Sequence, residues 1–459
     1  FSFTAIATLH PMKTFTYAQI WTIAYPILIS TLMEQLIGMT DAAFLGRVGE
    51  IELGASALGG IFYIAVFMLG FGFSIGAQIL MARRNGEGNY ERIGTIFYHS
   101  LAFLFLMACT LCGLTHWLAP VILENIISSH AVFEATNAYI DWRVFGFFFA
   151  FINVMFRAFY VATTQTRTLT LNSVVMVLSN VVFNYVLIFG KFGLPALGIA
   201  GAAIGSCLAE MVSSLFFIVY TCRRIPYAQY ALNRLPRFRF NLLGKILGIS
   251  VWTMVQNFLS LATWFLFFLS VEHLGESSLA ATNIVRNISS FTFMTVIALA
   301  STASTLTSNL IGAGHIESVR PMQNRVVRMG FVVLAPLIAV IGFFPDAVMS
   351  IFTNDAALKA TARGALYVML SSYIFTIPAQ ILFHSVSGTG NTRTALVIEA
   401  TALFIYCIYI GIVIFHFRVS LPYCWLSEHV YAVFALIFSF IYLKFGNCLL
   451  YTSPSPRDA

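Results

Sequence analysis

Long runs of apolar residues, separated by short charged or Pro- and Gly-containing breaks, follow one another from residue 18 to residue 444. Each run reaches the ~20 residues that a helix needs to cross the hydrocarbon core of a bilayer. The pattern therefore predicts an all-α integral membrane protein with twelve transmembrane helices. The predicted spans are 18–44, 55–82, 93–117, 138–160, 169–189, 199–221, 247–270, 280–310, 327–344, 362–386, 395–417 and 425–444.

The composition indicates that membrane lipid, rather than water, solvates most of the surface. Of the 459 residues, 59% are hydrophobic and 9% are charged, whereas about 25% are charged in an ordinary soluble protein. The sequence contains no nucleophile elbow, metal-ligand spacing or phosphate-binding loop. We therefore expect a protein that is not an enzyme and that uses neither a cofactor nor a metal.

Both ends of the sequence differ in character from the rest. Met12 directly precedes the first apolar run, so we interpret residues 1–11 as upstream sequence. Residues 448–459 follow an abrupt change of composition and look like translated adapter sequence, which predicts a non-native tail. Neither segment enters the predicted fold.

Positive charge is concentrated in every second connecting segment. Those segments carry 14 Lys and Arg residues, six of them in residues 222–245, whereas the alternate set carries 4. The positive-inside rule then places both termini and the segment 222–245 in the cytoplasm, with the protein in the inner (plasma) membrane. The net charge of +7 is explained in this way, and we expect no nucleic-acid partner.

The chain contains an internal duplication at a constant offset of 226 residues. Residues 47–55 match 273–281, and residues 166–168 match 392–394, without a gap between them. Each copy holds six predicted spans, an even number, so the copies share one orientation and are related by a pseudo-twofold axis along the membrane normal. The predicted domains are an N-terminal six-helix lobe (12–221), a basic linker (222–245) and a C-terminal six-helix lobe (246–445).

Several short motifs occur together in the first half. They are Pro26, the segments 40–49 (TDAAFLGRVG) and 82–88 (ARRNGEG), Tyr139, and the segments 180–190 (NVVFNYVLIFG) and 197–203 (LGIAGAA). In this combination the chain resembles the multidrug and toxic compound extrusion (MATE) family, part of the wider multidrug/oligosaccharidyl-lipid/polysaccharide flippase superfamily. The loop after the second span lacks the basic motif of the major facilitators. The resemblance covers almost all of the twelve spans.

Two carboxylates lie on one face of the first predicted helix. Thr31, Glu34, Gly38 and Asp41 follow at spacings of 3, 4 and 3 residues. A charge at the bilayer centre costs roughly 2.5–3.5 kcal/mol, so these side chains must face the protein interior or water. A carboxyl group removed from water binds a proton more readily, and amide or hydroxyl oxygens beside it would suit Na⁺.

The resemblance implies that Asp41 is the principal coupling carboxylate. Tyr139, Asn180 and Asn184 would surround it, and Pro26 would allow the first helix to bend. Glu34 is a second candidate for cation binding. The alternatives are that Asp41 is an interfacial or packing residue, and that the two asparagines only hold helices together.

The second half departs from relatives that carry a C-terminal cation site, which have a Glu in the seventh span and an Asp in the tenth. No carboxylate stands at mid-depth in either span here, and Phe267 occupies the position offset from Asp41. We therefore predict ion coupling in the N-terminal lobe and a mainly apolar, aromatic lining from the C-terminal lobe. Candidates for the substrate cleft are Gln256, Asn257, Trp264 and Gln380. Glu210, Arg286 and Glu399 also lie in predicted spans, and the sequence does not pair them.

The resemblance implies an H⁺- or Na⁺-coupled antiporter that exports amphipathic, cationic small molecules by alternating access. We expect it to be a monomer. A lipid-linked oligosaccharide flippase of the same superfamily is the nearest alternative, since cleft cations would meet a pyrophosphate. The flippase alternative rests on four arginines, Arg143, Arg157, Arg286 and Arg363. A channel or receptor is the alternative from a different class.

Overall fold

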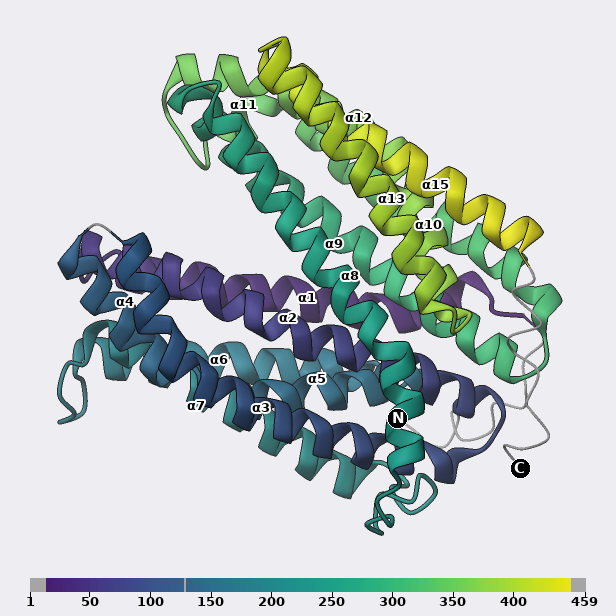
Figure 1. Ribbon diagram of the computed structural model, residues 1–459. Coiled ribbons are helices and arrows are strands. Elements are labelled where there is room, and N and C mark those ends of the chain that lie inside the picture. The colour runs from purple at the N-terminus through teal and green to yellow at the C-terminus, as the bar shows by residue number, and fades with distance from the viewer. Residues whose placement is uncertain (1–13, 128, 447–459) are drawn as a thin grey trace. The chain divides into compact units, whose positions relative to one another are not determined.

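The computed structural model describes residues 14–127 and 129–446, and these form helices joined by short loops (Figure 1). The segments 1–11 and 448–459, interpreted above as foreign to the fold, lie outside the described residues. The helices are α1 (Tyr17–Leu45), α2 (Glu50–Gly86), α3 (Tyr90–Ile126), α4 (His130–Arg143), α5 (Gly146–Ala162), α6 (Arg167–Phe189), α7 (Gly198–Arg224), α8 (Phe240–Glu272), α9 (Glu276–Gly312), η1 (Ile316–Ser318), α10 (Val319–Phe343), α11 (Pro345–Met349), α12 (Ala356–Gly388), α13 (Thr392–Ile410), η2 (Gly411–His416), α14 (Leu421–Trp425) and α15 (Ser427–Phe445).

The prediction of twelve apolar spans is confirmed. Within the described residues, eleven helical segments are long and apolar enough to cross a membrane, and the pair α4 and α5 makes the twelfth. This pair is bent by 52° at a short break. Several helices extend beyond the predicted spans, and α3 continues nine residues past the predicted end at 117. Hydropathy marks the part of a helix that lies in lipid, whereas the backbone hydrogen bonds continue beyond it.

The chain folds into two compact units. The N-terminal unit consists of residues 25–81 and 89–254. The C-terminal unit consists of residues 82–88, the chain from Val255 onward, and the described residues before Tyr25. The boundaries of these units fall inside α1, α2 and α8, whereas the predicted lobes follow the repeat, so the lobe boundaries stay a prediction.

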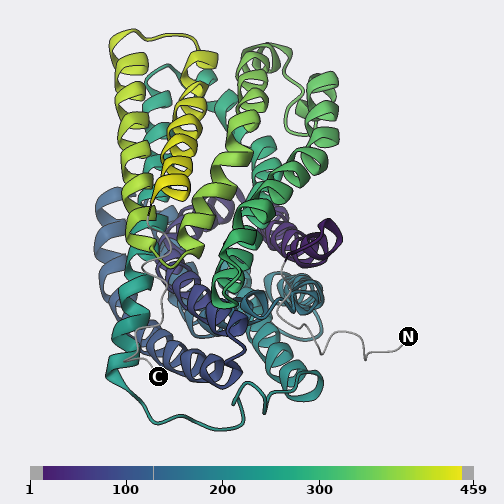
Figure 2. The same ribbon diagram turned by 90° about the vertical axis from the view of Figure 1, so that its right-hand side faces the viewer.

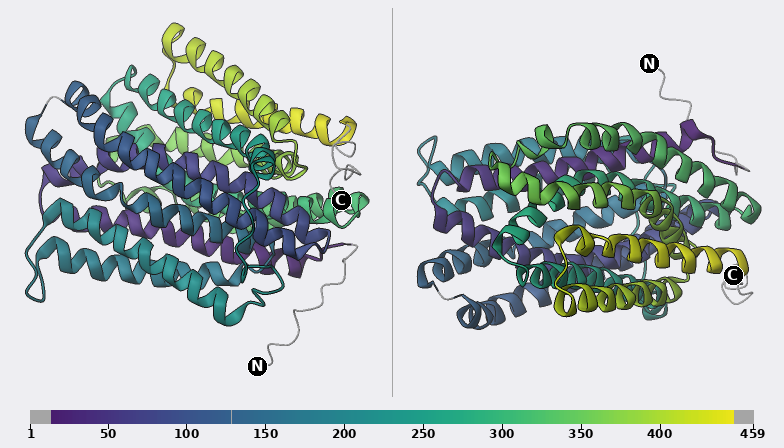
Figure 3. Two further views of the ribbon diagram at one scale, coloured as in Figure 1. Left: turned by 60° about the horizontal axis from the view of Figure 1, so that its bottom comes forward. Right: turned by 90° about the horizontal axis from the view of Figure 1, so that it is seen from above.

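Each unit is a bundle of long helices that pack directly on one another. In the N-terminal unit, α6 and α7 lie side by side, and α7 also packs on α4 and α5 (Figure 3). In the C-terminal unit, α12 packs on α9 and α15, and α13 also packs on α15 (Figure 2). A core of small residues from these last helices, Ala379, Ala402, Ala432 and Ala435, allows the close approach.

Two glycines one turn apart on α2 set its packing against the first half of α8, within the N-terminal unit. A Cβ atom on Gly72 would lie 2.7 Å from Cα of Met254, and one on Gly76 would lie 2.6 Å from Cα of Ser250. The Thr253 hydroxyl donates to the Gly72 carbonyl at 2.7 Å. The glycines therefore serve helix packing, as small residues at this spacing do in membrane proteins.

We predict that Gly76→Ala destabilises the protein. The added methyl group would meet the short side chain of Ser250 and also its Cα, which cannot move aside without the backbone, and overpacking of this kind costs about 1–3 kcal/mol. The measurement is the thermal unfolding midpoint in detergent, which should fall. Gly60→Ala on the same helix is the control, because nothing lies within 4 Å of its Cβ position and alanine favours the helix. Equal midpoints for the two variants would contradict the packing role of Gly76.

Candidate cation site

Asp41 lies near the end of α1 and is bound by neutral groups from two other helices of the N-terminal unit. The Asn184 amide of α6 donates to Asp41 Oδ1 at 2.5 Å. The Ser206 hydroxyl of α7 donates to Asp41 Oδ2 at 3.2 Å. Neither donor carries a charge, so the carboxylate is oriented without being neutralised by these two bonds.

The asparagines of α6 form a second row behind this carboxylate. Asn184 also donates to Asn180 Oδ1 at 3.2 Å, and Asn180 donates to Ser206 at 3.2 Å. Asn184 is fully buried, and its Oδ1 atom has no hydrogen-bond partner among the described residues. Gly205 faces this oxygen, and a Cβ there would lie 3.2 Å from Asn184 Cγ.

These groups offer chemistry suited to a small hard cation or a proton. Carboxylate, amide and hydroxyl oxygens are hard ligands, and a buried acceptor without a donor leaves binding capacity unused. The sequence-based prediction grouped Asp41, Asn180 and Asn184, and the structure brings these three together. Ser206 joins them although no sequence signal marked it, because serine is common in the small-residue faces of membrane helices.

A buried ion pair lies beside this cluster, at the bend between α4 and α5. Arg143 donates to Glu210 of α7 through two nitrogens, at 2.6 and 3.0 Å. The guanidinium also covers the ring of Tyr63 at 3.7 Å, and the Tyr63 hydroxyl donates to Glu210 at 3.3 Å. Their exposed fractions are 9% for Arg143 and 5% for Glu210. Each charge is therefore compensated inside the bundle.

The other N-terminal candidates lie outside the bonds to Asp41. Glu34 pairs with Arg157 of α5 at 3.2 Å, and its side chain is 47% exposed. Tyr139 is buried on α4 against Gly59 of α2, one turn before Arg143. The helix α1 runs unbroken through Pro26. The cation role of Glu34 and Tyr139 and the hinge role of Pro26 stay predictions.

The C-terminal unit contains a buried carboxylate. The prediction that this half supplies a mainly apolar, aromatic lining did not include it. Glu399 of α13 accepts from Ser260 of α8 at 2.7 Å and from Tyr431 of α15 at 2.8 Å. Gln380 of α12 donates to the Tyr431 hydroxyl at 3.4 Å. Gln256, one turn before Ser260, keeps a buried Oε1 atom without a partner among the described residues. Glu399, left unpaired by the sequence, thus has two neutral donors.

The remaining cleft candidates lie elsewhere on α8. Trp264 packs against Phe268 and Trp425, and Phe267, the counterpart of Asp41, is fully buried in the same aromatic cluster. Asn257 is half-buried. Arg286 of α9 donates to Asn283 at 2.9 Å and covers the ring of Phe268 at 5.0 Å. Their part in a substrate cleft stays a prediction.

Two repeated sets of six spans, with ionisable groups inside the helix bundles, are typical of membrane transporters. The match to family models agrees with this class. Residues 26–186 and 253–418 match the MatE family model, and the chain belongs to this family. The two matched segments begin 227 residues apart, within one residue of the offset of the predicted duplication.

Similar proteins span nearly the whole chain. A "Probable multidrug resistance protein NorM" from Synechocystis sp. is 26% identical over 443 residues, which cover 89% of this chain and 93% of that protein. A "Probable multidrug resistance protein YoeA" from Bacillus subtilis is 22% identical over 426 residues, 92% of each chain.

Solved structures show the same fold. The outward-facing conformation of a multidrug resistance MATE family transporter matches with a TM-score of 0.86 at 18% identity, over 96% of this chain and 97% of that one. A MOP superfamily transporter from Pyrococcus furiosus matches with a TM-score of 0.83 at 17% identity, over 95% of both chains. The predicted family and the twelve-helix fold in two bundles are confirmed.

We predict that Arg143→Met destabilises the protein by about 3–5 kcal/mol, because Glu210 would remain buried without its cation. Adding Glu210→Met should recover part of this loss. The measurement is the free energy of unfolding, or the thermal midpoint, in detergent.

Arg157→Met is the matched control. Its partner Glu34 is about half exposed, and pairs of that kind contribute at most about 1 kcal/mol. A loss for Arg143→Met as small as that of the control, or a double variant less stable than Arg143→Met alone, would contradict the proposed compensation.

Proposed function

We propose that this protein is an antiporter that couples inward movement of H⁺ or Na⁺ to export of amphipathic, cationic organic compounds. The observation that carries the proposal is the coordination of Asp41, whose oxygens accept hydrogen bonds from neutral groups only. A carboxylate of this kind inside a membrane bundle can take up a cation and release it. The names of the relatives support export of drugs.

Ion binding at Asp41 would act on the packing of α1 against α6 and α7. A proton or Na⁺ on the carboxylate competes with the amide of Asn184 and the hydroxyl of Ser206 for the same oxygens. Loss of either hydrogen bond removes a link between α1 and its neighbours. Pro26 lacks the N–H group that would bond the preceding turn, so α1 can bend there. Alternation between two such states would expose the substrate to one side of the membrane at a time.

The charges of the N-terminal unit favour a cationic substrate. Arg143 is compensated by Glu210, and Arg157 is compensated by Glu34. Asp41 then leaves one negative charge in this set. The substrate cation would be released when the coupling ion binds, and it would bind again when that ion leaves. Substrate and coupling ion then exclude each other, which is the requirement for exchange.

The same pairing weighs against a flippase for lipid-linked pyrophosphates. Such a protein needs cations that are available to phosphate oxygens. Arg143 and Arg157 are paired as above, and Arg363 is bound to Asp346 at 2.5 Å. Arg286 is occupied by Asn283 and the Phe268 ring. We further propose a monomer in the inner membrane with both termini in the cytoplasm, from the distribution of basic residues.

We predict that Asp41→Asn abolishes efflux of a fluorescent cation from cells while the amount of protein in the membrane stays normal. The substitution keeps the size of the side chain and removes the charge that binds the coupling ion. Asp141→Asn is the control, since its side chain is 48% exposed near the end of α4, and it should transport normally. Full efflux by Asp41→Asn would remove this residue from the mechanism.

Transport by proteoliposomes separates the two coupling ions. A pH gradient at equal Na⁺ and a Na⁺ gradient at equal pH are imposed in turn, and uptake of the fluorescent cation is followed. One gradient should drive uptake, and Asp41→Asn should abolish that response. Uptake that neither gradient accelerates would contradict coupled exchange.

We predict that Glu399→Gln keeps the response to the driving gradient at half the wild-type rate or more. Gln preserves an acceptor for the Ser260 and Tyr431 hydroxyls, and it lacks the charge whose burial without a cation would be costly. The measurement is the initial rate in the same proteoliposomes, beside Asp41→Asn. Loss of the gradient response in both variants would show that coupling is shared between the two units.

A further inference from the structure

The segment that follows α7 is held to α3 at two separate places. The Tyr98 hydroxyl of α3 donates to the Leu232 carbonyl. One residue along α3, His99 Nε2 accepts the backbone N–H of Arg239 at 2.8 Å. Residues 233–238 therefore cross the surface of α3 between two fixed points, all within the N-terminal unit.

The imidazole of His99 has a defined role in this attachment. Its Nδ1 lies 2.7 Å from the Thr95 carbonyl, one turn earlier on α3, so Nδ1 carries the proton and donates. Nε2 is then free to accept from Arg239. The ring of Phe238 stacks on the imidazole with centroids 4.9 Å apart and planes 15° apart. His99 is buried, so water does not compete for the hydrogen bond at the second fixed point.

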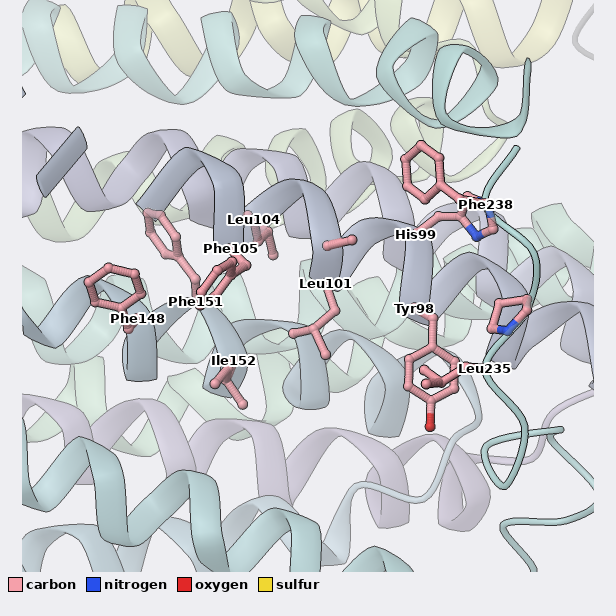
Figure 4. A pocket seen from close by; sticks show the side chains of 12 residues that line it. Tyr98, His99, Leu101, Leu104, Phe105, Phe148, Phe151, Ile152, Leu235 and Phe238 are labelled. Atoms are coloured by element: carbon pink, nitrogen blue, oxygen red, sulfur yellow. The ribbon is translucent and has the colours of Figure 1, made fainter. Parts of the chain in front are cut away.

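An apolar pocket of about 600 Å³ runs along α3 from this crossing segment (Figure 4). Leu235, Pro236 and Phe238 line it from the segment, and Leu235 and Phe238 lie at one end. Side chains of α3 and α5 form the rest, and the pocket extends along α3 to Phe105, Phe148 and Phe151 at the other end. A space with hydrocarbon walls and almost no polar group suits an apolar chain better than water.

Basic residues stand next in sequence to the pocket-lining residues of the segment. Arg234, Arg237 and Arg239 are exposed on the segment, and residues 222–245 include no acidic residue. The part of the chain that the structure describes supplies no hydrogen-bond acceptor to these three guanidinium groups. The backbone of residues 235–239 is irregular and without helix, and apolar and basic side chains alternate from Pro236 to Phe240. The segment that lines one end of the apolar pocket therefore also carries exposed cationic side chains.

We propose that this pocket binds one acyl chain of an anionic phospholipid, with the lipid phosphate held by Arg234 and Arg237. The occupant must be apolar over the length of the pocket and anionic at its end. A membrane lipid satisfies both requirements, and a cationic export substrate fails the second. The basic composition of the segment places it at the cytoplasmic leaflet, where anionic lipids attract such residues. The proposal does not depend on the transport mechanism.

The test is native mass spectrometry of the full-length protein in detergent, titrated with phosphatidylglycerol or phosphatidylcholine of identical chains. The wild type should retain one phosphatidylglycerol in preference to phosphatidylcholine. Arg234→Gln with Arg237→Gln should weaken phosphatidylglycerol binding roughly twenty-five-fold, about five-fold for each arginine, and leave phosphatidylcholine unaffected. Ala102→Trp, which fills the pocket from α3, should reduce retention of both lipids.

Lys191→Gln is the matched control, an exposed cation in the loop between α6 and α7, and it should bind as the wild type does. The thermal midpoint of each variant establishes that it is folded. Equal retention of the two lipids by the wild type would overturn the assignment of an anionic occupant. Unchanged binding by folded Ala102→Trp, or displacement of phosphatidylglycerol by millimolar inorganic phosphate alone, would overturn the role of the pocket in holding the chain.

Discussion

The cost of placing charge inside a membrane bundle governs the polar interior of this protein. Some of its ionisable side chains within spans are compensated by another charge, as Arg143 is by Glu210. Asp41 is bound by an amide and a hydroxyl instead. A charge that its surroundings hold in place but do not neutralise retains an affinity for a mobile cation. The coupling role that we propose for Asp41 rests on this difference between neighbouring carboxylates.

The bend between α4 and α5 and the ion pair are parts of one arrangement. Gly146 begins α5 directly beside the pair, and a Cβ there would lie 2.6 Å from Glu210 Oε2. A larger residue at this position would separate Arg143 from its partner. The break also frees backbone groups that a straight helix would pair, and burial of that break requires close packing. The bend therefore brings Arg143 to Glu210, and the pair in turn fixes α4 against α7.

The sequence allowed the spans to be predicted well, because a helix that crosses lipid requires a long apolar run. The 226-residue repeat also allows each span of the first half to be compared with its counterpart in the second half. The grouping of Asp41 with Asn180 and Asn184 was available from the motif resemblance, and the structure places the three within hydrogen-bonding distance. The pairing of Arg143 with Glu210 could not be obtained in this way. The two residues are 67 positions apart, and hydropathy gives neither the rotation of α7 nor the bend before α5. Ser206 was missed because small polar residues are frequent in such helices.

The two repeats have diverged most where the chemistry is concentrated. At the position of Asp41 the second repeat has Phe267, which is buried with Trp264 and Trp425 and takes part in packing. A buried carboxylate of this half, Glu399, comes instead from α13 and is held by hydroxyl groups of α8 and α15. The repeat therefore preserves the helical framework, since apolar faces and small residues suffice for packing. Because the polar positions are not needed for that framework, each half can place its charge on a different helix.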